Sequence, residues 1–250
     1  MLAILSPAKR MRLLPLPEGV PTSRPVFEED AVRLNEELKE YAPWQLESLM
    51  RINPELALET FDRIRQFGSA PDTAALLAYE GLQYQHLLPE TFSAAQWKAA
   101  GVRLRVLSGL YGLLRPTDLI RPYRLEMGCR PVSPEGNLYR FWGSRLRDQL
   151  FAETDLLINL ASAEYAKTVE KHLHSGDWMI TVDFLMRRRG KLQTPATWAK
   201  MARGEMAGWM VRQGVSRPEE LKDFCWEGFR YAPALSSSQR LCFFWETDTL

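Results

Sequence analysis

Short apolar runs recur along the chain and predict its strands. Most of them are about four to eight residues long and rich in branched side chains, which is typical of buried strands. The last two flank a serine-rich turn at 236–238, and we expect them to pair with each other. The predicted strands are Leu2–Leu5, Leu104–Leu107, Leu156–Leu160, Met179–Met186, Phe229–Tyr231 and Leu241–Trp245.

Between these runs, apolar residues return every three or four positions, which predicts amphipathic helices. Pro43 and Pro54 are placed to open new helices within residues 28–68, and Ser93 is placed to cap a helix that ends at Gly101. Strands that alternate with helices predict a mixed α/β fold, a mixed sheet flanked by helices, in one compact domain over residues 1–250. Further helices are predicted at 73–79, 138–151, 163–173, 197–213 and 219–224.

The segment Leu104–Gly128 joins a buried run to a restricted loop. Gly109 and Gly112 allow a positive φ or a close approach of another backbone segment, and two prolines fix φ further on. Two interpretations remain open. The loop either presents a guanidinium cluster to a ligand, or it is a structural crossover whose arginines pair with nearby carboxylates. The residues concerned are Arg115, Arg121 and Arg124, beside Asp118 and Glu126.

Composition narrows the class of protein. The chain is 46% hydrophobic and 25% charged, which is ordinary for a globular protein, and its apolar runs fall short of the ~20 residues that span a bilayer. Three cysteines without CxxC spacing favour a reducing compartment. We therefore expect a cytoplasmic protein that does not contact membranes, and we expect it to be a monomer.

The net charge of +1 conceals an uneven distribution. Residues 101–150 hold nine basic and four acidic residues, and residues 187–217 hold eight basic and one acidic residue. Val102–Leu107 also alternates arginine with apolar residues, as a strand with one polar face does. Two separated basic blocks on a nearly neutral chain predict a local surface for an anionic partner.

Three of the predicted strands end in similar polar sequences, which begin at Ser6, Ser108 and Ser162. Ligands of α/β sheets bind outside the carboxyl ends of strands, so we expect these ends to form one cleft. The simpler alternative for Ser162 is that it only caps a helix. The side chains expected to converge are Lys9, Ser108, Asn159, Ser162, Glu164, Tyr165 and Lys167.

Signatures of a metal or cofactor site are missing from the sequence. It has no GxGxxG, GxxxxGK[ST], HExxH or GxSxG motif. His172 and His174 are two positions apart, which is poor spacing for one metal on a helix face, and His86 is isolated. None of the three has a glutamate three residues before it, as di-iron helices do. We expect no metal, no cofactor and no stoichiometric iron.

Five motifs carry a resemblance to a known family. They occur in the family's order and span nearly the whole chain: Ser6–Lys9 (SPAK), Ser108–Gly128 (SGLYGLLRPTDLIRPYRLEMG), Leu138–Gly143 (LYRFWG), Asn159–Lys167 (NLASAEYAK) and Lys200–Gly204 (KMARG). On these motifs the chain resembles the YaaA family of peroxide-stress proteins. The resemblance implies a role in surviving hydrogen peroxide linked to limiting free iron, a helix–hairpin–helix-like element, a basic cleft and binding to double-stranded DNA. The turn at Gly109–Gly112 is the first candidate for the hairpin, and the turn after Gly101 is the second.

Two functions follow as hypotheses. The first is a stress protein that binds double-stranded DNA with little sequence preference and limits iron-driven damage indirectly. Its predicted contacts are Lys9, Gly109, Gly112, Arg115, Arg121, Arg124, Lys167, Arg187, Arg188, Arg189, Lys200 and Arg203. The second is an enzyme acting on a nucleotide or nucleobase in the strand-end cleft. Its candidate catalytic residues are Lys9, Glu164, Glu126 and Tyr165.

Overall fold

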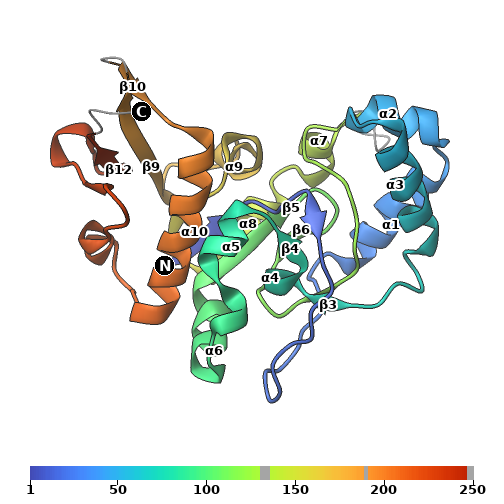
Figure 1. Cartoon of the computed structure of the whole chain (residues 1–250), viewed down its shortest axis with the longest axis horizontal. Coiled ribbons are helices and arrows are strands. Elements are labelled where there is room, and N and C mark those ends of the chain that lie inside the picture. The colour runs from blue at the N-terminus through green and yellow to red at the C-terminus, as the bar shows by residue number, and fades with distance from the viewer. Residues whose placement is uncertain (130–135, 189–190, 247–250) are drawn as a thin grey trace.

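The computed structural model describes residues 1–129, 136–188 and 191–246. Its centre is a sheet in which β12, β9, β8, β1 and β5 run parallel to their neighbours, as the apolar runs predict (Figure 1). Antiparallel strands complete it on both sides. The strand order is β11 (Arg230–Tyr231), β12 (Arg240–Trp245), β9 (Trp178–Arg188), β8 (Leu156–Asn159), β1 (Leu2–Leu5), β5 (Leu104–Ser108) and β6 (Gly112–Leu114), with β10 (Lys191–Gln193) paired to β9.

The central strands are buried on both faces, because helices cover the sheet. All four residues of β1 are buried, which explains its uninterrupted apolar sequence. All five residues of β5 are buried as well, although Arg105 and Ser108 are polar. Two short ladders lie outside the main sheet. They pair β2 (Arg10–Met11) with β4 (Tyr79–Glu80), and β3 (Thr73–Ala74) with β7 (Leu119–Ile120).

The N-terminal helices form a group at one end of the molecule, and α5 lies beside α10 toward the other end (Figure 1). Pro43 and Pro54 begin α2 and α3 as the sequence predicts. The helices are α1 (Glu28–Lys39), α2 (Pro43–Met50), α3 (Pro54–Gln66), α4 (Ala75–Ala78), α5 (Leu82–Leu87), α6 (Ala94–Arg103), α7 (Leu138–Trp142), α8 (Arg145–Glu153), α9 (Ala163–Glu170) and α10 (Ala196–Gln213), with 3-10 turns η1 (Pro89–Thr91), η2 (Pro218–Asp223) and η3 (Pro233–Leu235).

Three local predictions were wrong. Gly101 does not end its helix, because α6 continues to Arg103. The expected helix at 138–151 is two helices, since Gly143 adopts φ +50 between α7 and α8. Residues 73–79 hold only one turn of helix, flanked by β3 and β4. The described residues nevertheless form a single compact α/β domain with a mixed, mostly parallel sheet flanked by helices.

Candidate ligand pocket at the strand ends

A pocket of about 340 Å³ opens where β1 ends and α9 begins. Its walls come from the segment after β1, the start of α5, the loop 123–126, the start of α9 and one face of α10. These elements lie far apart in the sequence, and the parallel sheet brings them together. The polar and aromatic lining consists of Ser6, Lys9, Arg10, Glu80, Gln83, Tyr84, Tyr123, Arg124, Glu126, Ser162, Glu164, Tyr165, Lys200 and Arg203.

The floor of the pocket joins two adjacent strand ends through serines. The Ser162 N–H donates to Ser6 Oγ at 2.8 Å, and Ser6 Oγ donates to Ser162 Oγ at 3.2 Å. Ser162 occupies the N-cap position of α9, but its side chain makes no capping hydrogen bond to that helix. Tyr84 fixes the same corner, because its hydroxyl donates to the Ser6 carbonyl at 2.8 Å.

An ion-pair chain forms one side of the pocket. Lys9 Nζ lies 2.8 Å from Glu126 Oε2, and Arg124 Nη2 lies 3.3 Å from Glu126 Oε1. Glu164 accepts a hydrogen bond from the Gly128 N–H at 2.9 Å through Oε1. Both carboxylates are thus held in place by the chain itself. Within the described residues, Glu164 Oε2 has no hydrogen-bond partner and remains available to a ligand.

Buried donors without partners are concentrated at this pocket. Of six buried side-chain polar atoms that lack a hydrogen bond among the described residues, three belong to lining residues: Gln83 Nε2, Arg124 Nε and Arg203 Nε. Leaving such a donor unpaired costs about 1–3 kcal/mol. Burial lowers the pKa of Arg203, although the charge of Asp183 opposes the shift, and Arg203 forms no ion pair within 4 Å in the described part of the chain. The pocket therefore holds donors that an acceptor-rich ligand would satisfy.

Three tyrosines supply the aromatic part of the pocket wall: Tyr84, Tyr123 and Tyr165. The Tyr123 hydroxyl lies 2.7 Å from Ser108 Oγ and 2.8 Å from the Tyr79 hydroxyl, and burial raises the pKa of Tyr123 to about 12. Burial likewise raises the pKa of Tyr165 well above its usual value. Both phenols stay neutral at physiological pH. Tyr165, predicted as a catalytic candidate, is consequently suited to donating a hydrogen bond rather than to acting as a base.

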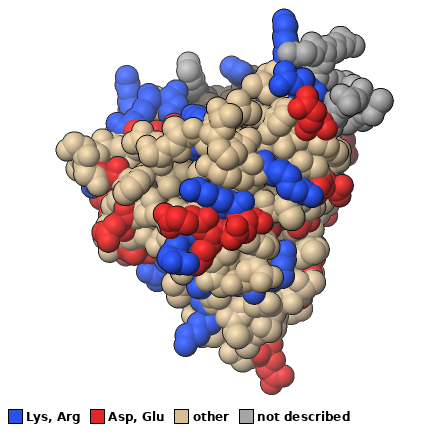
Figure 2. All heavy atoms as spheres, turned by 90° about the vertical axis from the view of Figure 1, so that its left-hand side faces the viewer, with Lys and Arg blue, Asp and Glu red and all other residues tan. Residues whose placement is uncertain are grey.

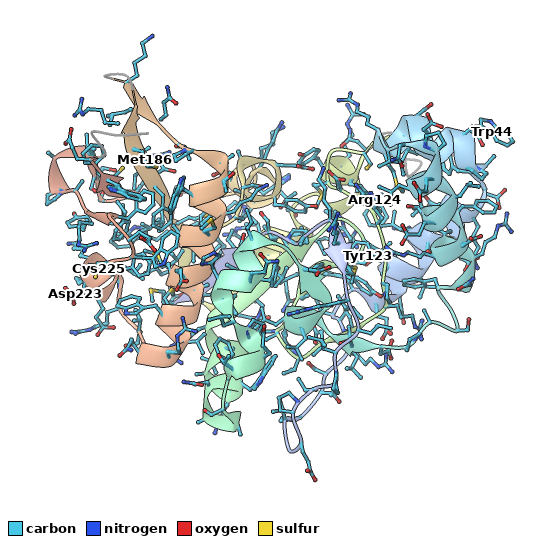
Figure 3. All side chains as sticks on the ribbon, viewed as in Figure 1. Trp44, Tyr123, Arg124, Met186, Asp223 and Cys225 are labelled. Atoms are coloured by element: carbon cyan, nitrogen blue, oxygen red, sulfur yellow. The ribbon has the colours of Figure 1, made fainter. Side chains whose placement is uncertain are left out.

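The structure brings together eight of the predicted site residues in one pocket: Lys9, Arg124, Glu126, Ser162, Glu164, Tyr165, Lys200 and Arg203. Arg124 comes from the first basic block, and Lys200 and Arg203 come from the second. Figure 3 shows Arg124 and Tyr123 in the interior, between the α1–α3 group and the rest of the chain. Of the seven side chains expected to converge at the strand ends, four line this pocket: Lys9, Ser162, Glu164 and Tyr165.

Three other strand-end residues do not line the pocket. Ser108 is fully buried behind Tyr123. Asn159 accepts a hydrogen bond from the Ala161 N–H at 2.9 Å, so it shapes the turn after β8. Lys167 is exposed on α9, with its Nζ 5.2 Å from the Tyr139 ring centre.

Most of the crossover arginines serve the fold. Arg115 Nη2 lies 3.8 Å from Glu153, and Arg121 Nε lies 3.3 Å from Asp72. Of the ion pairs expected between arginines and carboxylates within Leu104–Gly128, the structure contains only Arg124 with Glu126. Asp118 instead accepts hydrogen bonds from Ser23 Oγ and the Arg115 N–H, both at 2.7 Å.

Arg105 also corrects an expectation, because the arginine face predicted at 102–107 is not a polar surface. Arg105 is buried, and its Nε donates to Glu153 Oε2 at 2.9 Å. Arg103 belongs to α6, and its Nε donates to the Val215 carbonyl at 2.9 Å. Both guanidinium groups therefore hold elements of the fold together.

The two glycines of the crossover are required by packing. A Cβ on Gly109 would lie 2.3 Å from the Leu125 carbonyl oxygen. Gly112 has φ +65, and a Cβ there would lie 2.7 Å from the Trp142 ring. Their turn joins β5 to β6, and Gly101 lies inside α6, which β5 follows directly. Neither turn lies between two helices, so neither location fits a helix–hairpin–helix element.

Arg187 is separate from the pocket. Arg187 is exposed on β9 and its Nε lies 2.9 Å from Glu246. Arg189 and the side chain of Arg188 lie outside the described residues. On the face that Figure 2 shows, basic and acidic side chains are interspersed.

Five polar or aromatic lining residues were not predicted as site residues from the sequence: Arg10, Glu80, Gln83, Tyr84 and Tyr123. The pairing of β2 with β4 places Arg10 opposite Glu80, and α5 brings Gln83 and Tyr84 to the end of β1. A single sequence contains no signal for such contacts between distant segments. The pattern of apolar residues at 81–88 does not distinguish a helix from a strand, so the sequence does not predict α5.

Membrane-spanning helices and metal-binding clusters are both absent from the described residues. No helix among them is long and apolar enough to cross a membrane. No group of three or more His, Cys, Asp or Glu side chains in this part of the chain is arranged to hold a metal ion.

The fold and pocket define an α/β protein with a mixed-charge, ligand-sized site at its strand ends. A family model described as Peroxide stress protein YaaA matches residues 1–235. Similar proteins named "UPF0246 protein" occur in Cellvibrio japonicus, 40% identical, and in Hahella chejuensis, 41% identical; each match covers 97% of this chain and 98% of the relative. One from Agathobacter rectalis is 35% identical over 96% of this chain and 97% of the relative. The chain belongs to the YaaA family of peroxide stress proteins.

Proposed function

We propose that this chain acts in the peroxide stress response by binding double-stranded DNA, and that its strand-end pocket receives one nucleotide unit. The observation that carries the proposal is the convergence of five cationic side chains on one pocket: Lys9, Arg10, Arg124, Lys200 and Arg203. Cations clustered beside aromatic side chains suit a nucleotide, which has an anionic backbone and a flat base. Any effect on iron is indirect in this proposal.

The backbone of the duplex contacts the rim. Lys200 and Arg10 are exposed and have no ion pair within the described residues, and Lys167 is exposed on the neighbouring helix α9. Arg115 and Arg121 do not contact the duplex in this proposal, because they already pair with Glu153 and Asp72. Contacts to phosphates alone carry no sequence information, so we expect little sequence preference.

A helix pair beside the pocket is our choice for the hairpin element. The turn 51–53 joins α2 to α3, and Arg51 lies in it, exposed and with φ 54. Asn53 caps α3 and lines a second hollow of about 400 Å³ that it shares with Lys9, Arg10 and Arg124. A backbone that runs along this hollow would reach the rim of the pocket.

The salt dependence of DNA binding tests the proposal. Fluorescence anisotropy with a labelled duplex is expected to give a linear fall of log K with log salt, and Lys200→Gln is expected to reduce the slope by about 0.9. Lys98→Gln is the control, since Lys98 is exposed on α6, does not line the pocket and has no ion pair among the described residues. Affinity that stays constant between about 50 and 200 mM salt would contradict the proposal.

The second candidate function is an enzyme that cleaves a nucleotide or modifies its base. The position of Glu164 favours it, because one carboxylate oxygen is held by Gly128 and the other is available within the pocket. In this scheme Glu164 is the general base, and Lys9 fixes an anionic group of the substrate. Incubation with nucleosides and nucleotides, followed by chromatography, is expected to release a product that Glu164→Gln abolishes. No turnover of any of them would exclude this candidate.

A further inference from the structure

The charge of the pocket lining is not balanced. Lys9, Arg10, Arg124, Lys200 and Arg203 contribute five positive charges, whereas Glu80, Glu126 and Glu164 contribute three negative charges, which leaves an excess of two. Lys9 and Arg124 both pair with the carboxylate of Glu126, so two positive charges share one negative charge. A ligand with two negative charges would neutralise the lining.

The unpaired donors lie on the same walls as this excess. Gln83 is more than nine-tenths buried, lines the pocket, and its Nε2 has no hydrogen-bond partner in the described chain. Arg203 on α10 and Arg124 on the loop 123–126 each add a buried Nε that also lacks one. Guanidinium forks match the oxygens of a phosphate, and an amide N–H is a neutral donor to the same group.

We propose that this pocket binds a phosphomonoester, with Arg203, Arg124 and Gln83 as donors to its terminal phosphate. The inference rests on the proposed function and narrows it to a terminal phosphate, carried by a free nucleotide or by a phosphorylated DNA end. A monoester carries about two negative charges at neutral pH, as phosphorylated side chains do. An internal phosphodiester carries one negative charge and would leave the lining with an excess of one positive charge.

The rest of such a ligand also fits the lining. Tyr84, Tyr123 and Tyr165 supply aromatic surface, and Glu164 Oε2 offers an acceptor to a hydroxyl or amino group. A volume of about 340 Å³ lies in the range of small-molecule sites, roughly 300–1,000 Å³. The chemistry therefore matches one nucleotide with its phosphate on the arginine side.

Isothermal titration calorimetry with three probes tests the proposal on the wild-type protein. The probes are adenosine 5′-monophosphate, the methyl ester of that phosphate, and adenosine. We expect the monophosphate to bind at least about tenfold more tightly than the methyl ester, because a charge-assisted contact is lost from the ester. Equal affinity for the monophosphate and its ester, or for the monophosphate and adenosine, would overturn the proposal.

Variants assign the donors. Arg203→Gln is expected to weaken monophosphate binding by about tenfold or more, and Arg203→Lys to recover it only in part, since an ammonium group has no fork. Gln83→Leu is expected to weaken the monophosphate and to leave adenosine affinity unchanged. Lys222→Gln is the matched control, because Lys222 lines a separate cavity. Circular dichroism checks that each variant is folded, and unchanged monophosphate affinity in folded Arg203→Gln would contradict the assignment.

A DNA competition separates this inference from the proposed function and identifies the source of the phosphate. A duplex closed by hairpins at both ends tests DNA binding alone. An open duplex is compared with and without a 5′-phosphate as competitor of the monophosphate. Competition only by the phosphorylated duplex supports a DNA end, and competition by neither open duplex supports a free nucleotide. Binding of the closed duplex without preference for the monoester would overturn the inference and leave the proposed function standing.

Discussion

The crossover segment 104–128 and the strand-end pocket are both rich in arginine, yet they use it differently. In the crossover, Arg105 and Arg115 contact Glu153, and Arg121 contacts Asp72, so the carboxylates come from distant segments of the same chain. In the pocket, Arg203 has no such partner among the described residues and its Nε is buried and unpaired. Arg105, Arg115 and Arg121 of the crossover therefore stabilise the fold, whereas Arg203 in the pocket has a donor that a ligand could satisfy.

This difference shows why a count of basic residues does not locate a binding surface. Residues 101–150 carry an excess of five positive charges. Arg105, Arg115 and Arg121 of the crossover are nevertheless paired with carboxylates of the same molecule. A buried hydrogen-bond donor without a partner is a better guide to a binding site than a count of basic residues. Native proteins seldom leave such a donor unsatisfied, so a ligand or water is expected to bind it. Three experiments would sharpen or break this comparison.

The largest effect is expected from Gly109→Ala in the crossover. The new Cβ would lie 2.3 Å from the Leu125 carbonyl oxygen, and backbone on both sides prevents an easy adjustment. We expect the free energy of unfolding in urea to fall by about 3 kcal/mol or more. Gly101→Ala is the control: nothing lies within 4 Å of its Cβ, and it sits in α6, so a gain of about 0.5–1 kcal/mol is expected. A loss below about 1 kcal/mol for Gly109→Ala would contradict the close packing.

The next effect separates the two kinds of arginine. Glu153→Gln leaves buried Arg105 without its charged partner, and we expect a loss of about 3 kcal/mol in the free energy of unfolding. Arg203→Gln removes a charge that burial already disfavours, so we expect a change of no more than about 1 kcal/mol. Glu36→Gln, in an exposed pair with Lys39, is the control near zero. If Arg203→Gln is as costly as Glu153→Gln, the two regions do not differ as described.

The smallest effect concerns Asp118 and pH. Burial raises the pKa of Asp118 above its ordinary value of 3.8, although hydrogen bonds from Ser23 and Arg115 oppose the rise. The folded protein therefore binds this proton more tightly than the unfolded chain does, and stability is lost as pH rises through the raised pKa. We expect the stability of Asp118→Asn relative to wild type to increase from about pH 4 to neutral pH in urea titrations.

The pH experiment has a control of opposite sign. Hydrogen bonds from the Ser216 N–H and from Arg217 hold the pKa of Glu220 at about 2, so the wild-type carboxylate stabilises the fold above its unfolded pKa. That stability is lost as pH falls toward about 2. The free energy of unfolding of Glu220→Gln, relative to that of wild type, is therefore expected to decrease as pH rises through this window. A difference between Asp118→Asn and wild type that does not change with pH would rule out the raised pKa.

Much of the fold follows from local pattern. Four-residue apolar runs such as Leu2–Leu5 were recognisable because a strand buried on both faces needs an unbroken apolar sequence. Pro43 and Pro54 marked helix starts because a missing N–H costs nothing there. The helix expected at 138–151 was wrong because the periodicity continues across Gly143, whose positive φ separates α7 from α8.

The sequence by itself determined the mixed α/β class, the main strands, the family and eight of the residues that line the pocket. Only the tertiary structure decided which charges are satisfied. Arg105 and Arg203 look alike in the sequence, but one meets a carboxylate 48 residues away and the other meets none in the described chain. Gln83 entered the site because α5 packs beside α10 at the end of β1. Local patterns fix dihedral preferences and burial periods, whereas pairing between distant side chains depends on contacts that exist only after folding.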